Sequence, residues 1–348
     1  MNPSSRENDL PSRAAWPRLL FIPALATVLV CLLLLALGMS PPAIGRALGS
    51  GSLGSWLKFS HVLSVWSPLL LCSCGLLFTF RAGLWNIGIE GQVIVGAIGC
   101  TAVLRLWDGF LPPSVLLPLA LAAGGLAGGL WGILAGELRN RGGVNEIFGG
   151  LGLNFVAQGL IIWLIFGPWK RAGIASMSGT DLLSPRFWLT TPPGWRVAPV
   201  ALAVAVLALA VTILLLDRTR FGLHLRAVGA NPGAARLFGI RPDRVSMRAM
   251  LLAGMLAGLA GSLQVTAVYH RLIPAISSGY GYLGLLVVML ANYRSPAVPL
   301  IALFFACLVT GSIQLPITLQ IDSSLAGVIQ GAFVLSALLV HGLRRGKD

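Results

Sequence analysis

Ten long apolar runs, separated by short polar segments, constrain the fold of this chain more than any other feature. A helix needs about 20 mostly apolar residues to cross the hydrocarbon core of a membrane. Backbone groups in lipid must be satisfied within the segment, which favours helices for such runs. The sequence therefore predicts an all-α polytopic membrane protein with about ten transmembrane helices. The runs lie at 19–38, 61–80, 92–107, 113–136, 146–166, 197–216, 249–268, 279–292, 297–314 and 324–341.

Two of these runs, 92–107 and 279–292, are too short to cross a bilayer upright, and glycines flank both. Short interrupted runs of this kind indicate broken or re-entrant helices near a central pathway. The first run is too long for a signal-peptide core and has no clear cleavage site, so we expect it to be retained. The sequence predicts a membrane domain over 19–341 between polar tails at 1–18 and 342–348.

The positive charges predict an orientation. The net charge is +14, but the arginines lie at the ends of apolar runs, which indicates topology signals and no nucleic-acid partner. When the chain alternates through ten helices, seventeen of the 25 Lys and Arg residues fall on the side of the N-terminus. The positive-inside rule then places both termini in the cytoplasm. The longest internal loop is 217–248.

The sequence contains no catalytic or metal-binding signature. It lacks a GxxxxGK[ST] phosphate loop, an HExxH motif and a GxSxG motif, and its histidines and cysteines have no ligand spacing. We therefore expect no catalytic residue, no metal and no cofactor, and a membrane-embedded enzyme has no residues to support it. Energy for any transport must come from a partner or from an ion gradient.

A polar segment, FRAGLWNIGIEGQ at 80–92, stands between two apolar runs. Asn86, Glu90 and Gln92 cannot face lipid without a large penalty, so they line a pathway or a protein seam. Glu90 has two interpretations: it contributes to a pathway, or it hydrogen-bonds a broken helix together. Glu146, which follows Asn145 at a predicted helix start, is favoured there by the helix dipole.

Three further patterns predict local structure. In the internal loop, Asn231 is a helix cap, Pro232 a first helical residue and Gly239 a stop, which predicts a short helix over 232–238. That helix suits either docking onto a soluble subunit or lying on lipid headgroups. The segment 167–196 is rich in Pro and Trp, which argues against a continuous helix. Glycines four apart predict close helix packing, with a dimerisation face as the alternative; they are Gly124, Gly128, Gly132 and Gly136, with Gly254 and Gly258.

Three motifs resemble one family of membrane proteins, the permeases of ATP-binding cassette (ABC) importers of the simple-sugar and nucleoside type. Residues 81–92, RAGLWNIGIEGQ, are similar to the family signature RAGLFNIGxEGQ. Residues 219–240, TRFGLHLRAVGANPGAARLFGI, resemble its internal loop, and GVNE at 143–146 resembles a third element. The larger family includes ribose and branched-chain amino-acid permeases. The NIGxEGQ form is nearer to the nucleoside permeases, although Trp85 stands where Phe is usual.

The resemblance implies a permease subunit in the cytoplasmic membrane that works with ABC ATPase subunits, a second related permease and an extracytoplasmic substrate-binding lipoprotein. Nucleosides are the expected substrates, with a simple sugar such as a pentose as the alternative. An ion-coupled secondary transporter would need acids in mid-membrane, for which only Glu90 is a good candidate. The expected pathway residues are Trp85, Asn86, Glu90, Gln92, Asn154 and Gln158. The expected ATPase-coupling helix involves Gly229, Asn231, Pro232, Ala234, Ala235, Phe238 and Gly239.

Overall fold

A computed structural model describes residues 40–171 and 179–319, together with a few positions between 328 and 335. The described part is helical and contains no strand. Each apolar run that lies within it forms a helix, which confirms the all-α polytopic fold. The run 19–38 and the tails 1–18 and 342–348 lie outside the described residues, as does nearly all of the run 324–341.

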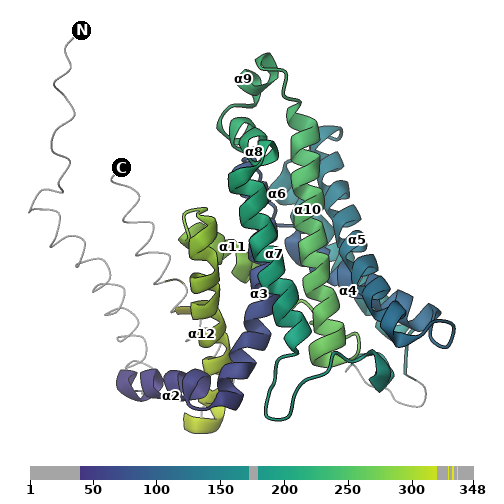
Figure 1. Ribbon diagram of the computed structural model, residues 1–348, viewed down its shortest axis with the longest axis vertical. Coiled ribbons are helices and arrows are strands. Elements are labelled where there is room, and N and C mark those ends of the chain that lie inside the picture. The colour runs from purple at the N-terminus through teal and green to yellow at the C-terminus, as the bar shows by residue number, and fades with distance from the viewer. Residues whose placement is uncertain (1–39, 172–178, 320–327, 329–330, 333–334, 336–348) are drawn as a thin grey trace, which may run out of the picture. The chain divides into compact units, whose positions relative to one another are not determined.

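Most helices follow one another with short connections, and the exception is the long segment 167–198 between α6 and α7 (Figure 1). Seven of them are long and apolar enough to cross a membrane, counting only described residues and joining α10 with η2 and η3 with α12. The elements are α2 (Pro41–Leu53), α3 (Trp56–Arg81), α4 (Ile89–Leu106), α5 (Pro113–Asn140), α6 (Glu146–Phe166), η1 (Pro185–Phe187), α7 (Pro199–Arg218), α8 (Arg220–Ala230), α9 (Pro232–Leu237), α10 (Pro242–Leu263), η2 (Gln264–Tyr269), α11 (Tyr280–Leu290), η3 (Ser295–Ala297) and α12 (Val298–Leu319).

The two runs that were predicted to be short differ from each other. Helix α4 begins three residues before its run and has 18 residues, so it is long enough to cross a membrane, which corrects that expectation. Helix α11 has 11 residues, which is about 16 Å of helix and only half of a bilayer. The chain between η2 and α11 is not helical, so α11 is half of a broken span.

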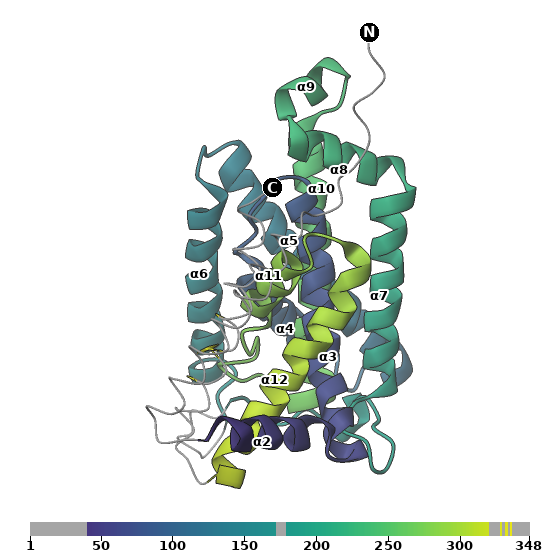
Figure 2. The same ribbon diagram turned by 90° about the vertical axis from the view of Figure 1, so that its left-hand side faces the viewer.

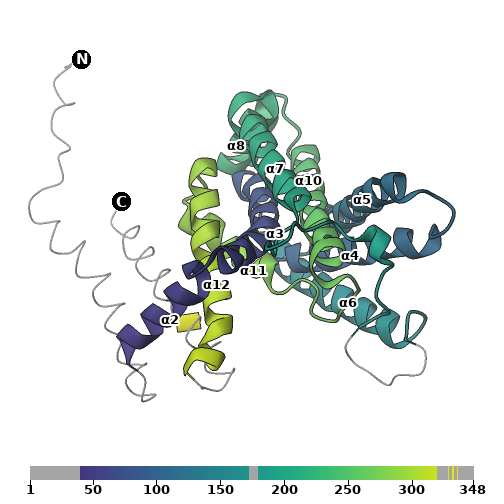
Figure 3. The ribbon, with the colours of Figure 1, turned by 60° about the horizontal axis from the view of Figure 1, so that its bottom comes forward.

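Helices α5 and α10 form the closest packed seam of residues 52–310. Figure 3 shows α10 lying between α7 and α5. A Cβ on Gly128 would lie 2.7 Å from the Cα of Gly258 and would overlap the carbonyl oxygen of Gly254. The two backbones therefore touch through glycines, which confirms the predicted close packing. No larger residue fits at these positions without moving a helix.

The helices of residues 52–310 run between two ends, which we call the α9 end and the loop end. At the α9 end, Arg81 at the end of α3 pairs with Asp217 at the end of α7, with 2.7 Å between Nη1 and Oδ1. At the loop end, the backbone N–H of Arg196 donates to Ser60 at the start of α3. Charges assigned to opposite sides by the predicted alternation thus lie at opposite ends.

The segment after α6, described at residues 167–171 and from residue 179 onward, lies at the loop end without forming a long helix. Its only regular element among the described residues is the 3-10 turn η1, as the prolines predict. Its backbone N–H groups donate to the chain around η2: Thr180 to Leu272 (2.9 Å), Leu183 to His270 (2.8 Å) and Leu189 to Thr266 (2.9 Å). These bonds satisfy carbonyl groups where the helix ends.

Described residues 40–51 and 311–319 belong to a second compact unit, apart from residues 52–310. Within this unit α2 lies against the last part of α12. A Cβ on Gly311 would be 2.8 Å from the carbonyl oxygen of Leu48, and a Cβ on Gly51 would be 3.0 Å from the Cβ of Gln314. Glycines again permit the contact between the two helices.

Candidate functional site

The chain turns back between α3 and α4 in a non-helical segment, residues 82–88. Gly83 has a φ of +74°, and a Cβ there would lie 3.3 Å from the Cα of Gly229 in α8. A Cβ on Gly88 would lie 3.1 Å from the Cα of Gly150 in α6. Glycine permits the left-handed turn and both close approaches. The segment is therefore held between α8 and α6.

Glu90, in the first turn of α4, holds the start of α11. Its Oε1 accepts from the backbone N–H of Gly279 at 3.1 Å, and its Oε2 accepts from that of Gly281 at 2.8 Å. The side chain is buried. The first N–H groups of a helix lack helical acceptors and attract a carboxylate. One acid thus serves the N-terminal turns of two helices, and both of its oxygens are engaged by the chain.

Asn86 and Gln92 form a reciprocal pair beside Glu90. The Nδ2 of Asn86 donates to Oε1 of Gln92 at 3.2 Å, and the Nε2 of Gln92 donates to Oδ1 of Asn86 at 3.1 Å. Both side chains are fully buried. The pair closes the segment 82–88 onto α4 and satisfies two amides that would be costly to bury alone.

Asn154 of α6 joins three elements. Its Oδ1 accepts from the backbone N–H of Gly91 at 2.8 Å. Its Nδ2 donates to the carbonyl of Ile87 at 2.9 Å and to the hydroxyl of Tyr282 at 3.2 Å. Both amide hydrogens and the carbonyl oxygen are therefore used. Asn154 connects α6 to the segment 82–88, to α4 and to α11.

The other two predicted pathway residues have different surroundings. The ring of Trp85 is 40% exposed and meets Phe80 edge-on, with 5.3 Å between ring centroids. Phe80 also contacts Tyr293, so Trp85 belongs to an aromatic cluster at the α9 end. The Nε2 of Gln158 donates to the carbonyl of Pro274 at 3.1 Å. The pathway role of the six residues remains a prediction, while the structure shows that five of them brace the chain.

Sequence reasoning missed Tyr282. It lies in the first turn of α11 and is 43% exposed. The available signal was the stretch GYGYLG at 279–284, which places two tyrosines and three glycines between apolar runs. That Asn154 would reach Tyr282 could not be inferred, because the two residues are 128 positions apart.

Helix α9 projects beyond the rest of residues 52–310 (Figures 1 and 2). As predicted, Asn231 caps it: Oδ1 accepts from the N–H of Ala234 at 3.0 Å. Pro232 is its first residue, and Gly239 follows with a φ of +77°. Leu237 and Phe238 are 89% and 86% exposed. A short capped helix that ends in two uncovered apolar side chains is suited to binding another protein.

A charged cluster connects this region to the end of α3. Asp217 accepts from Arg81 at 2.7 Å and from Arg226 of α8 at 2.6 Å. Arg81 also donates to the Ser295 hydroxyl at 2.9 Å. Sequence analysis missed both Asp217 and helix α8. The signal for α8 was Thr219, whose Oγ1 accepts from the N–H of Gly222 at its start.

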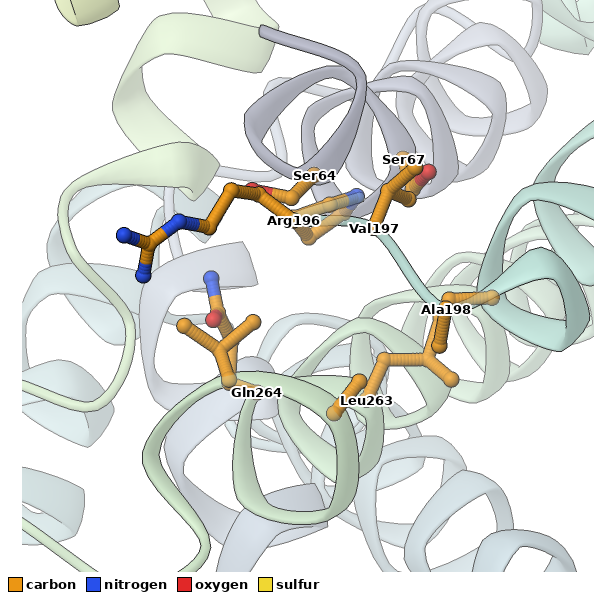
Figure 4. A pocket seen from close by; sticks show the side chains of 11 residues that line it. Ser64, Ser67, Arg196, Val197, Ala198, Leu263 and Gln264 are labelled. Atoms are coloured by element: carbon orange, nitrogen blue, oxygen red, sulfur yellow. The ribbon is translucent and has the colours of Figure 1, made fainter. Parts of the chain in front are cut away.

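A small pocket with a mainly apolar lining lies at the loop end between α3, the start of α7 and η2 (Figure 4). Ser64 and Ser67 of α3 line it, together with Arg196 and Gln264. Gln264 is buried, and its Oε1 has no hydrogen-bond partner among the described residues. Figure 4 shows its amide directed toward the side that Ser64 and Arg196 line.

The described part of the chain contains no cluster of side chains that would bind a metal ion. No group of three or more His, Cys, Asp or Glu side chains there is arranged to hold a metal ion. Cys72, Cys74 and Cys100 are buried free thiols, and Cys307 is half-buried. These are small core residues.

One family model matches most of the chain. It is described as branched-chain amino acid transport system / permease component, and it matches residues 59–338. The match covers the polar segment, the loop with α8 and α9, and the broken span.

Individual relatives match at moderate identity. A glucose ABC transporter permease protein of Haloferax volcanii is 32% identical over 321 residues, 90% of this chain and 84% of that protein. A guanosine ABC transporter permease protein of Bacillus subtilis is 28% identical over 334 residues, 93% and 94% of the two chains. A nucleoside ABC transporter permease protein of Lactococcus lactis is 25% identical over 311 residues, 85% and 84% of the two chains.

Proposed function

Because this chain belongs to the family of permease components of branched-chain amino acid transport systems, we propose that it is the permease subunit of an ABC importer for nucleosides. Its apolar helices and its relatives make it a multi-pass protein of the cytoplasmic membrane. The family match over residues 59–338 carries this proposal. ATP hydrolysis takes place in separate partner subunits.

Nucleosides and simple sugars are the two candidate substrates. The permeases for guanosine in Bacillus subtilis and for nucleosides in Lactococcus lactis each cover more than four fifths of this chain. The NIGxEGQ form at residues 86–92 also favours nucleosides. The glucose permease of Haloferax volcanii has the higher identity, 32%, which makes a simple sugar the second candidate.

An ion-coupled transporter working alone is less compatible with the site. Coupling by protons or sodium needs an acid in mid-membrane that exchanges its ligand. Both oxygens of Glu90 already accept backbone N–H groups of α11, so release of this carboxylate would leave buried donors without partners. The uncovered apolar end of α9 would also have no function in a transporter without subunits.

Helix α9 is the contact for the ATPase. Leu237 and Phe238 supply apolar side chains that a groove in a soluble subunit would cover, and Asn231 keeps the helix folded when it is alone. This assignment makes the α9 end cytoplasmic, in agreement with the positive charges at that end.

Movement of α9 reaches the membrane through α8. The backbone of α8 touches the segment 82–88 at Gly229 and Gly83, and Arg226 shares Asp217 with Arg81. A rigid-body shift of α8 and α9 therefore displaces the end of α3 together with the polar segment. The segment carries Asn86, whose pairing positions α4. ATP binding to the partner subunits would thus change access to the pathway beside the break.

The remaining partners are a second related permease and an extracytoplasmic substrate-binding lipoprotein. The pathway lies between the two permeases, along the face on which the break between α4 and α11 opens. The lipoprotein delivers solute at the loop end, where the segment 179–198 is pinned to η2 by backbone hydrogen bonds. Membrane lipid covers the rest of the apolar surface.

Uptake measurements test the function directly. Labelled guanosine and labelled glucose would be offered to proteoliposomes that contain this permease with its partner permease, ATPase and binding protein. We expect guanosine uptake that stops when the ATPase is inactivated. Uptake of glucose alone would show that the substrate is a simple sugar and not a nucleoside. Uptake that persists with an inactive ATPase would contradict the importer assignment.

A second experiment tests the role of α9. Phe238→Asp places a charge on the exposed end of the helix, and we expect it to abolish retention of the ATPase during purification. Phe110→Asp is the matched control, because Phe110 is 79% exposed but lies at the loop end. Equal retention of the ATPase by both variants would contradict the assignment of α9.

A further inference from the structure

Tyr282 is a half-exposed polar side chain deep within the membrane domain. Helix α11 runs along α3, and a Cβ on Gly284 would lie 3.3 Å from the Cβ of Cys72. The far end of α11 reaches Arg81, which donates to the carbonyl of Tyr293. Tyr282 therefore lies farther from the α9 end than Gly284 does, beside the middle of the 26-residue helix α3.

A position at this depth restricts what Tyr282 can face. The chain just before α11, residues 270–279, is not helical, and Ala275 and Ser278 within it are exposed. Non-helical backbone and hydroxyl groups at membrane depth are tolerated where they are buried in protein or line water, and not where they face lipid. Leu272 and Ile276 anchor this stretch in the core, while Ala275, Ser278 and Tyr282 are left exposed, so we infer that this exposed face lines an aqueous path.

The hydrogen bonds around Tyr282 leave its hydroxyl proton free to be donated. Asn154 Nδ2 donates to the Tyr282 hydroxyl, so the hydroxyl oxygen is an acceptor in this bond. A tyrosine hydroxyl has one proton of its own to donate, and no acceptor for it is found among the described residues. Asn154 meets the hydroxyl through its donor Nδ2, while its Oδ1 is directed at the N–H of Gly91. The other polar side chains of the break, Glu90, Asn86 and Gln92, are occupied with the chain itself.

We propose that Tyr282 is a substrate-contacting residue of the translocation path, held in orientation by Asn154, and that it recognises a planar heterocycle carrying a hydrogen-bond acceptor. The exposed ring offers a face for stacking, which every nucleobase can use. The free hydroxyl proton is donated to a carbonyl or ring nitrogen of the solute. This inference rests on the proposed importer function. It assigns substrate specificity to Tyr282, because the side chains of Glu90, Asn86 and Gln92 are already hydrogen-bonded within the chain.

Chemical labelling tests the location of Tyr282 without a known substrate. In the complete transporter, Tyr282→Cys would be treated with a charged thiol reagent, and the labelling would be compared with that of the unaltered chain. We expect labelling, because a thiol in water ionises and reacts. Leu207→Cys is the control, because Leu207 is 66% exposed near the middle of α7 and is expected to face lipid. An unreactive Tyr282→Cys, or equal labelling of Leu207→Cys, would overturn the proposal.

Transport kinetics test the contact itself, on whichever of guanosine and glucose the unaltered complex carries. We expect Tyr282→Phe to raise KM about tenfold, the equivalent of one hydrogen bond. Tyr280→Phe is the control, since Tyr280 is a buried tyrosine two residues away; its KM should not change. An unchanged KM in Tyr282→Phe, or an equal rise in Tyr280→Phe, would overturn the proposal. Failure of the unaltered complex to carry guanosine would instead contradict the proposed substrate.

Discussion

The seam between α5 and α10 and the break between α4 and α11 hold helices together by opposite means. In the seam, glycines such as Gly128 and Gly254 bring two unbroken backbones into contact, and no polar side chain is required. In the break, the backbones are interrupted, and Glu90, Asn154 and the Asn86–Gln92 pair satisfy groups that a continuous helix would satisfy itself.

The difference indicates where the molecule can change shape. The seam is stabilised by close packing, which has a single geometry and resists displacement. The break is stabilised by directional hydrogen bonds, and the partly buried ones among them, such as that from Asn154 to Tyr282, can be exchanged for bonds to water or to solute at a small net cost. Movement during transport is therefore expected in the break, while the seam provides the fixed frame.

The largest effect is expected from removing the carboxylate of the break. Glu90→Ala leaves the N–H groups of Gly279 and Gly281 without acceptors at about 1–3 kcal/mol each, so the free energy of unfolding should fall by about 2–6 kcal/mol. Glu90→Gln keeps one acceptor oxygen and should lose about half as much. Denaturant titration of the purified chain measures both, and an alanine variant as stable as the original would contradict the bracing role.

A methyl group in the seam should have the next largest effect. Gly128→Ala places a Cβ on the backbone of α10, and overpacking of this kind costs about 1–3 kcal/mol. Gly152→Ala is the matched change on α6, where a Cβ meets nothing within 4 Å; it should leave stability unchanged or raise it by up to about 1 kcal/mol. Thermal unfolding of the two variants compares them, and equal melting temperatures would show that the seam is not close-packed.

The amide pair offers a test of how the break is stabilised. Gln92→Met leaves the buried amide of Asn86 without its partner and should cost about 1–3 kcal/mol. Adding Asn86→Leu removes the orphaned amide, so the double variant should be more stable than the single one. A double-mutant cycle on unfolding free energies measures this coupling. Additive losses would mean that the two amides act independently.

The smallest effect is expected outside both regions, at the cap of α9. Asn231→Ala removes the acceptor for the N–H of Ala234 and should destabilise this helix by about 1 kcal/mol. The loss should appear as faster amide hydrogen exchange confined to α9, with the break and the seam unaffected. Asn231→Asp retains the acceptor oxygen and should exchange like the original chain; slow exchange in Asn231→Ala would show that the cap is dispensable.

Much of this architecture could be predicted from sequence because its signals are local. Run length and hydropathy identify the membrane helices, and Asn231, Pro232 and Gly239 mark α9 through backbone capping rules. The length of α4 was underestimated because its first turn contains Glu90, a polar residue that a hydropathy criterion excludes. The capped helix α8 escaped notice because its apolar face is short and lies next to a basic loop.

The contacts of the site could not be predicted, because they join distant positions. Nothing near Glu90 in the sequence shows that its carboxylate meets the N-terminus of α11, and nothing near Asn154 shows that it reaches Tyr282. The π-helix η2 has an ordinary composition, so the unpartnered oxygen of Gln264 was not foreseen. Residue types indicated where polar chemistry lies, but partners depend on packing between segments far apart in the chain.

The bond between Glu90 and Gly281 spans 191 positions, and this distance has a consequence for biosynthesis. A ribosome adds about 5–20 residues per second, so Glu90 enters the membrane roughly 10–40 seconds before its partner exists. During that interval the Glu90 carboxylate must be solvated by water, neutralised by a proton or shielded by the insertion machinery. The N-terminal half of this protein is therefore inserted early and becomes native late, only when α11 arrives.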